Sequence, residues 1–299
     1  MSAQPADITT GPGTIAVVIP CHDDGATLEE AVESARSQDV PAQIVVVDDG
    51  STDPATRAAL ARVAAAGARV LHQPNRGPAP ARMAGVRATR TEYALPLDAD
   101  DRLLPGALRV LRDALERDPD AVAAWGSARH FGSLDFVQRS LPRLDPWHVS
   151  YQNHLPLSAL YRREIVLAVG GWELEGGYED WDLWMTLAEA GYRGIGVPAL
   201  TGEYRIQPGR RLADSSRRHA ERCDALRERH PRLFAERRSH RRASSAPRLL
   251  KAVLPVLDAL PLTPTPKRLL GGAACYLAHG SGWPTMVARL RAHRIRRAR

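Results

Sequence analysis

The sequence predicts an α/β fold in which a mostly parallel β-sheet is covered by helices on both faces. Short apolar runs alternate with amphipathic stretches four times within residues 15–125, which is the pattern of parallel strands joined by crossover helices. Of the 299 residues, 44% are hydrophobic and 25% are charged. These are ordinary globular values, and a chain of this length is long enough to bury a large core.

Five apolar runs supply the predicted strands. The first, Ile15–Pro20, is continuously apolar and ends in proline, as expected for a strand that is buried on both faces. The later runs are similarly short, and they cover Gln43–Val47, Arg69–His72, Tyr93–Leu97 and Ala121–Trp125.

The stretches between these strands predict helices. Thr27 and Glu30 have the spacing of a capping box, and an amphipathic stretch follows them as far as Gln38. Proline is well tolerated in the first turn of a helix. Each of the next three predicted helices begins with one, and they cover Pro54–Ala66, Pro78–Thr89 and Pro105–Arg117.

The second half of the chain is less regular. Residues 132–157 have a mixed composition with several prolines, which predicts a long functional loop with short elements. We expect a helix at Glu179–Ala190 and late strands at 195–197 and 201–206. The expected organisation is a flexible N-terminus over 1–13, one domain over 14–239 and an extension over 240–299.

The extension is expected to be a basic helical tail. Residues 241–299 hold 12 Lys or Arg and one acid, Asp258, for a net charge of +11, whereas the first 240 residues carry a net charge of −4. Prolines, including Pro255, break its apolar runs, which are too short to span a bilayer. Apolar runs beside basic residues suit an anionic membrane surface. A solvated helical appendage is an equal alternative, and nucleic acid is not expected as a partner.

The cysteines and histidines give no metal or disulfide signature. Wide spacing supports neither a disulfide framework nor a zinc knuckle for Cys21, Cys223 and Cys275, which favours a reducing compartment. His148 and His154 have no metal-ligand spacing and are interpreted as loop residues. The first residues lack the pattern of a signal peptide. We therefore expect a cytoplasmic protein, peripheral on the inner face of the membrane if the tail binds lipid.

Acidic residues follow three of the predicted strands. Ligands of open α/β sheets bind beyond the carboxyl ends of the strands, so these clusters are expected to share one rim. Crowded carboxylates repel one another, and oxygen-bound Mg²⁺ or Mn²⁺ relieves that repulsion. Any single cluster is equally well explained by turns and helix caps, but three together favour a cation site. They are Asp23–Asp24, Asp48–Asp49 and Asp98–Asp101.

Familiar phosphate-binding loops are absent from the sequence. Neither G-x-G-x-x-G nor G-x-x-x-x-G-K-[ST] follows a strand. The two lysines, Lys251 and Lys267, both lie in the extension. Phosphate charge must then be met by arginine, backbone amides or metal. Arg82 is the best placed arginine, because it lies in the first turns of a predicted helix, where anions are favoured.

Five segments carry a family resemblance. They are IAVVIPCHDDGATLEEAVESARSQ, IVVVDDGSTD, RGPAPARMAG, LPLDADDRLLPGAL and GGYEDWDLWMTLAEAGYR, within residues 15–206. Their order and spacing resemble the inverting family 2 glycosyltransferases with the GT-A fold. The resemblance implies an enzyme with a nucleotide-sugar half over residues 14–126 and an acceptor half over residues 127–239.

The resemblance also implies roles on the donor side. The loop that contains Pro20, Cys21 and Asp23 would hold the nucleoside. Asp49 would hydrogen-bond the base, and Arg82 would face the donor, for which a UDP-sugar is the first expectation.

The D-x-D motif would complete the donor site. Its first acid, Asp98, would contact the ribose or the sugar, and its second acid, Asp100, would ligate Mn²⁺ or Mg²⁺.

On the acceptor side the resemblance makes Asp180 the catalytic base of an inverting transfer. Glu179, Trp181 and Tyr178 would line the acceptor, which is a carbohydrate, a lipid-linked glycan or a small molecule. Trp181 and Asp180 each have a plainer explanation, as a core residue and as an acid at a helix start.

Three departures from the family pattern leave the metal ligand set and the donor open. Met83 stands where asparagine is frequent, and His22-Asp23 replaces a frequent Tyr-Asn pair. Many relatives have a histidine shortly after the late Tyr-Arg pair, but here no histidine comes between Tyr204-Arg205 and His219. Two other functions therefore stay as alternatives. One is a sugar-nucleotide nucleotidyltransferase, and the other is a catalytically weak, GT-A-like binding protein.

Overall fold

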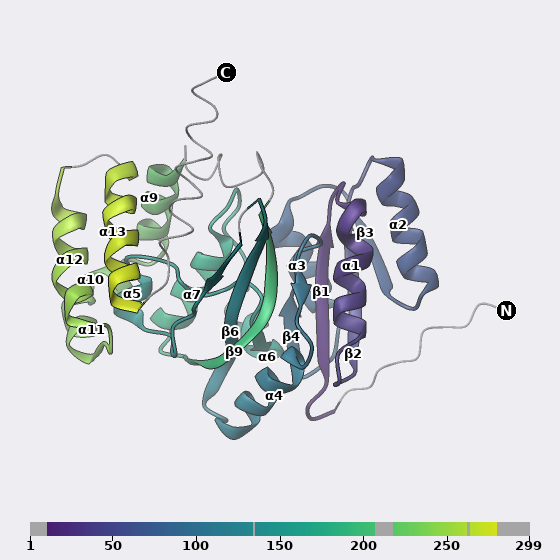
Figure 1. Cartoon of the computed structure of the whole chain (residues 1–299), viewed down its shortest axis with the longest axis horizontal. Helices are drawn as coiled ribbons and strands as arrows, with labels where there is room; N and C mark the ends of the chain where they lie inside the picture. Colours follow the sequence, from purple (N-terminus) through teal and green to yellow (C-terminus); the bar gives the residue numbers. More distant parts are fainter. Residues whose placement is uncertain (1–10, 134, 207–217, 262–263, 280–299) are drawn as a thin grey trace, which may run out of the picture.

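The computed structural model describes residues 11–133, 135–206, 218–261 and 264–279. Within this part of the chain, a nine-stranded mixed sheet has the order β3-β2-β1-β4-β8-β6-β9-β5, and β7 pairs with β6. Helices cover both faces of the sheet (Figure 1). The predicted α/β architecture is confirmed.

The first four strands are parallel and match the predicted runs. They are β1 (Ile15–Cys21), β2 (Ala42–Asp49), β3 (Arg69–Gln73) and β4 (Tyr93–Pro96). Every side chain of β1 is buried, as a strand covered on both faces requires. The register places Cys21 beside Asp48, so the segments that follow β1 and β2 share one edge of the sheet.

The helices of this half also follow the prediction. They are α1 (Gly25–Arg36), α2 (Pro54–Ala65), α3 (Pro78–Arg87) and α4 (Ala107–Arg117). The predicted capping box at Thr27 is wrong, because α1 begins two residues earlier. The Gly25 amide donates to Thr56 Oγ1 at 3.0 Å, and a Cβ at Gly25 would lie 2.4 Å from the Thr56 backbone. Contact with α2 therefore fixes where α1 begins.

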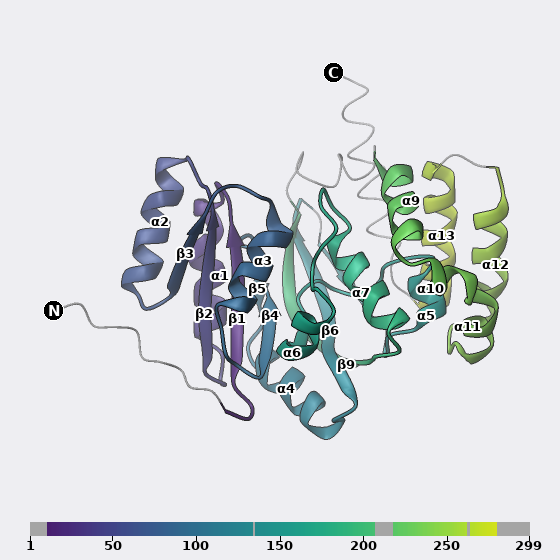
Figure 2. The same cartoon turned by 180° about the vertical axis from the view of Figure 1, so that it is seen from behind.

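The two faces of the sheet carry separate apolar clusters. One combines Ile15, Val17 and Ile19 of β1 with residues of α1, α2 and α4. The other combines Val18 with residues of α3, α6 (Arg163–Ala168) and α7 (Glu179–Glu189). Figure 1 shows α1 in front of the sheet, and Figure 2 shows α3 on the opposite face.

The second half of the sheet is longer than predicted. The strand expected at Ala121–Trp125 runs on as β6 (Ala121–Gly132), and the two late strands are one strand, β9 (Arg193–Ile206), parallel to β6. Antiparallel β8 (Leu160–Arg162) joins β4 to β6. The short β5 (Arg102–Leu103) and β7 (Phe136–Gln138) pair antiparallel with β9 and β6.

Helices follow the sheet and continue into the extension. They are α9 (His219–Arg229), α10 (Pro231–Ala235), α11 (Arg237–Ala243), α12 (Arg248–Ala259) and α13 (Pro264–His279). The expected division at residue 240 falls inside α11. Trp147 of α5 (Pro146–Val149) packs with Leu250, Leu254 and Cys275, so α12 and α13 are attached to the main domain.

The extension differs from the prediction at Pro255, and part of it lies outside the described residues. Pro255 does not end a helix but lies inside α12, where Leu250, Leu254 and Leu257 form a buried face. The arginines from residue 289 onward lie outside the described residues, so the proposed basic tail is untested. Among the helices that the structure describes, none has the length and apolarity to cross a membrane.

Candidate active site

The Asp49 carboxylate organises the loop that leads into α3. It lies at the end of β2 and is 3% exposed. Its Oδ1 accepts hydrogen bonds from Gln73 Nε2 at 2.8 Å and the Arg76 amide at 2.9 Å, and its Oδ2 accepts one from the Gly77 amide at 2.8 Å. A carboxylate accepts about four hydrogen bonds. These three bonds use most of that capacity and leave roughly one acceptor position, on Oδ2.

The loop after β1 is fixed by Asp23. This residue has a φ of 52°, and its carboxylate accepts hydrogen bonds from the amides of Thr52 and Asp53 at 2.8 and 2.9 Å. The Asp53 amide, foremost among these donors, holds the pKa of Asp23 below its usual value. The Asp23 carboxylate thus ties the β1 loop to the start of α2.

Pro20 and Cys21 are buried within β1. Burial raises the pKa of the Cys21 thiol to about 12 and keeps it neutral. A neutral, buried thiol is a poor nucleophile.

Three carboxylates meet just after β4. The ligand atoms of Asp98, Asp100 and Asp101 all lie within 4.8 Å of one another. Burial, together with the charges of Asp98 and Asp100, raises the pKa of Asp101 well above its usual value. This mutual repulsion is what a divalent cation with oxygen ligands relieves.

Arg205, near the end of β9, contacts the same cluster. Its amide donates to Asp101 Oδ1 at 2.8 Å, and its Nε donates to the Asp100 carbonyl at 3.0 Å. The resemblance connected the segment after Tyr204-Arg205 with the metal site, but it gave Arg205 itself no role. The pairing of β5 with β9 brings it there.

Arg82 joins the acid cluster to α7. It is 1% exposed, and it donates through Nη2 to Asp98 Oδ1 at 2.7 Å and through Nη1 to Glu179 Oε1 at 2.9 Å. Burial opposes its charge, but the two carboxylates outweigh burial and raise the pKa of Arg82 above its usual value. The guanidinium therefore stays charged and holds two distant segments together.

Asp180 lies in the first turn of α7. Its Oδ2 accepts a hydrogen bond from Asn153 Nδ2 at 2.9 Å. Burial, and then the charge of Glu179, raise its pKa to about 6, although the Trp181 amide and Arg82 pull the other way. A carboxyl group with this pKa is largely ionised at neutral pH and is more basic than an ordinary aspartate, so it suits general base catalysis. No motif or spacing in the sequence marked Asn153 as part of the site.

The three residues expected to line the acceptor differ in exposure. Trp181 is 8% exposed and donates through Nε1 to the Val149 carbonyl at 2.7 Å, which favours core packing over contact with an acceptor. Glu179 is also buried, in its ion pair with Arg82. Tyr178 is partly exposed, with its hydroxyl 2.7 Å from His219 Nδ1. It is the member of this group best placed to contact a ligand.

The sheet order and the acid-lined rim define the chain as a protein of the GT-A class. Two solved structures are similar to it over most of its length. The mannosyltransferase PcManGT from Pyrobaculum calidifontis, in complex with GDP-Man and Mn²⁺, gives a TM-score of 0.57 at 23% identity, covering 98% of this chain and 88% of that one. S. aureus TarS 1-349 with UDP-GlcNAc gives a TM-score of 0.56 at 15% identity, covering 88% and 73%. These likenesses establish the fold.

The family follows from the sequence comparison. The sequence model of glycosyl transferase family 2 matches residues 16–167, which are half of the chain. The chain therefore belongs to this family. The succinoglycan biosynthesis protein ExoO of Rhizobium meliloti is 38% identical over 154 residues, which are 51% of this chain and 43% of the relative. The pre-mycofactocin glycosyltransferase of Mycobacterium tuberculosis is 33% identical over 198 residues, 60% of this chain and 40% of the relative. The chain thus matches less than half the length of these curated relatives.

Proposed function

We propose that the protein transfers a sugar from a nucleoside-diphosphate donor to an acceptor hydroxyl, with inversion and with help from a divalent cation. The observation that carries this proposal is the buried Arg82 bridge. It links Asp98 of the acid cluster to Glu179, the residue next to Asp180. A site for the leaving diphosphate and a candidate base are thereby held on one rigid frame.

The donor half offers recognition of a nucleoside. The remaining acceptor position of Asp49 suits an N–H group of the base, and a UDP-sugar stays our first expectation. Similar folds have been solved with UDP-GlcNAc and with GDP-Man, so both bases belong in the test.

The acid cluster fits Mg²⁺ or Mn²⁺, because its oxygen ligands are close together and the pKa of Asp101 is raised by burial and then by its acidic neighbours. Asp100, with Asp98 and Asp101, would hold the ion. When bound, the ion would neutralise charge on the departing diphosphate. Two arginines hold the acids in position. Arg82 donates to the carboxylate of Asp98, and Arg205 donates to the backbone carbonyl of Asp100.

Asp180 would accept the proton of the attacking hydroxyl. Its partial burial raises its basicity, and Asn153 orients one of its oxygens. The family resemblance implies one displacement by the acceptor, with a single base and without an enzyme nucleophile, and hence inversion. A positioned base of this kind contributes about 10²- to 10⁴-fold to the rate.

The experiment is donor turnover by the full-length protein. Release of nucleoside diphosphate is measured for a panel of UDP- and GDP-sugars, with Mn²⁺ and with EDTA, and bound donors are identified first by thermal shift. We expect Mn²⁺-dependent release from one donor. Release of pyrophosphate from a nucleoside triphosphate and a sugar phosphate would indicate a nucleotidyltransferase instead. Binding without turnover, whichever acceptor is added, would indicate a binding protein.

The acceptor is proposed only by class: a carbohydrate, a lipid-linked glycan or a small molecule. A lipid-linked acceptor would fit a protein that works on the cytoplasmic face of a membrane, with the basic extension against anionic lipid.

A further inference from the structure

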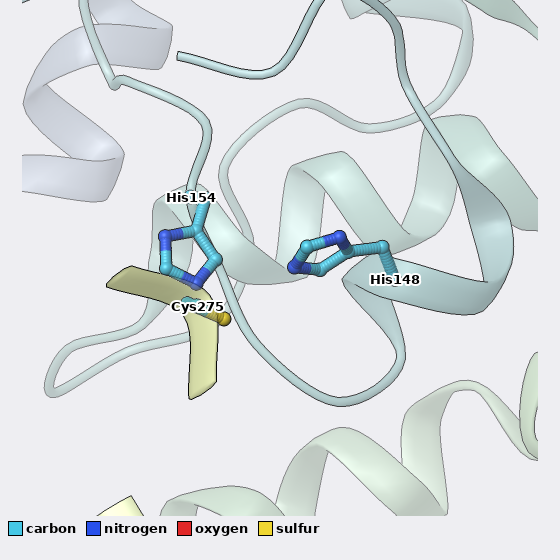
Figure 3. A group of neighbouring side chains, drawn as sticks. All are labelled: His148, His154 and Cys275. Carbon is cyan, nitrogen blue, oxygen red and sulfur yellow. The ribbon is translucent and has the colours of Figure 1, made fainter. Parts of the chain in front are cut away.

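A second group of metal-binding side chains lies between the main domain and the C-terminal helices (Figure 3). His148 comes from α5, His154 from the loop that follows, and Cys275 from α13. One ligand atom from each lies within 4.8 Å of the other two. The fold alone creates this group, because Cys275 is more than 120 positions from either histidine.

We propose that His148, His154 and Cys275 bind a zinc ion. Two imidazole nitrogens and a thiolate form a donor set that favours Zn²⁺ over Mg²⁺ or Mn²⁺. Zinc bonds of about 2.0–2.3 Å in a tetrahedron put neighbouring ligand atoms roughly 3.3–3.6 Å apart. From the observed limit of 4.8 Å, the distances between ligand atoms would have to shorten by about 1.2–1.5 Å. The site is therefore chemically distinct from the oxygen-lined acid cluster.

Gln152 completes the surroundings of the site. Cys275 Sγ donates to Gln152 Oε1 at 2.7 Å, and His154 Nε2 lies 2.9 Å from the same oxygen. On binding, the S–H bond breaks, a zinc–sulfur bond forms, and the proton goes to solvent. The hydrogen bond to Gln152 is lost. Its amide oxygen or a water then supplies the fourth ligand, and no oxidation or reduction occurs.

The position of the site indicates a structural role. Cys275 packs with Trp147, Leu250 and Leu254, so zinc would fasten α13 onto the main domain. The stretch between the two histidines contains Asn153, which donates to Asp180. If the proposed function is correct, the zinc also steadies the loop that orients the base. A metal-free explanation is simple packing, since the two imidazole rings lie edge to face at 5.2 Å.

Metal content of the full-length protein tests the proposal. We expect about one zinc per chain after dialysis, measured by inductively coupled plasma mass spectrometry. The Asp100→Asn variant should hold the same amount, because Asp100 belongs to the separate acid cluster. Cys275→Ser is nearly isosteric and should lose at least about nine-tenths of the zinc. The matched control is Cys223→Ser, because Cys223 lies outside the proposed site, with its Sγ 3.6 Å from His219 Nε2, and the variant should retain zinc.

Cobalt substitution gives a second measurement. Co²⁺ bound by thiolate should give a charge-transfer band in the wild type and in Cys223→Ser, but not in Cys275→Ser. His154→Gln keeps the thiolate and should weaken zinc binding by about 10- to 100-fold.

Folded wild-type protein that neither retains zinc nor shows the cobalt band would overturn the proposal. Equal zinc in the wild type and Cys275→Ser would show adventitious binding and overturn it as well. None of these readings depends on sugar transfer. Zinc-loaded protein without transferase activity would count against the proposed function alone.

Discussion

Replacing Asp180 with asparagine is expected to remove activity and to stabilise the protein. The folded-state pKa of this carboxyl is about 6, against an ordinary value of 3.8, chiefly because it is buried. One pKa unit corresponds to about 1.4 kcal/mol. Keeping Asp180 ionised in the native state therefore costs about 3 kcal/mol at most, to order of magnitude. Asparagine removes this cost, and its amide oxygen can still accept the hydrogen bond from Asn153.

The sign of the pH dependence follows from linkage. The folded pKa lies above the unfolded pKa, so the native state binds the proton more tightly, and wild-type stability falls as the pH rises from about 4 to 6. The Asp180→Asn variant has no ionisable group at this position, so its stability does not fall for this reason. Its advantage in melting temperature should be small at pH 4 and full at pH 7, at about 2–4 °C per kcal/mol.

Activity should change in the opposite direction. If Asp180 is the base, kcat should fall by about 10²- to 10⁴-fold while donor affinity stays nearly unchanged. In the wild type, kcat should fall as the pH drops through about 6, because the base becomes protonated. Glu175→Gln replaces an exposed acid just before α7 and is the control for both measurements.

Calorimetry, scanning melts and initial rates from pH 4 to 8 supply the data. Near-normal turnover of the Asp180 variant would refute its role as base. A variant that melts below the wild type at pH 7 would refute the argument from burial, whatever its activity.

Three further perturbations test other parts of the structure. Asp100→Asn should abolish Mn²⁺-dependent binding of nucleoside diphosphate, measured by titration calorimetry; unchanged affinity would remove Asp100 from the metal site. Arg82→Met leaves the carboxylates of Asp98 and Glu179 without their shared partner, and should lower the free energy of unfolding by about 3–5 kcal/mol in denaturant titrations at pH 7; a loss below 1 kcal/mol would contradict the bridge. Ending the chain after residue 279 keeps the packing of Trp147 on α12 and α13 but removes six arginines. If the extension binds anionic membranes, with each basic residue near the surface worth about 1 kcal/mol, only the full chain should co-sediment with anionic vesicles at low salt; equal behaviour of both chains would exclude that role.

Sequence alone was sufficient for β1 to β4 and for the helices that join them, apart from the start of α1. Runs such as Ile15–Pro20 are buried on both faces, and this demands apolar residues throughout, so the pattern is strong and local. The prolines that open α2 and α3 mark those helix starts for an equally local reason, their fixed φ. The acids after β1, β2 and β4 were found because parallel strands end at the same edge of a sheet.

The tertiary structure decided what depends on distant contacts. The start of α1 was missed because it is fixed by Thr56 of α2. The helix through Pro255 was missed because the packing of its buried leucines outweighs the local cost of proline, about 3 kcal/mol. Likewise, the resemblance suggested that Arg82 and Asp180 face ligands, but their charge states depend on burial and on Asp98 and Glu179. The grouping of His148 and His154 with Cys275 has no counterpart in local spacing, since the packing of α13 on Trp147 creates it. The sequence by itself determined the strands of the first half and the acids at the rim of the sheet, because each depends on a pattern of residues that are close together in the chain. Partners that stand far apart in the chain, and the pKa values that depend on them, are set by packing.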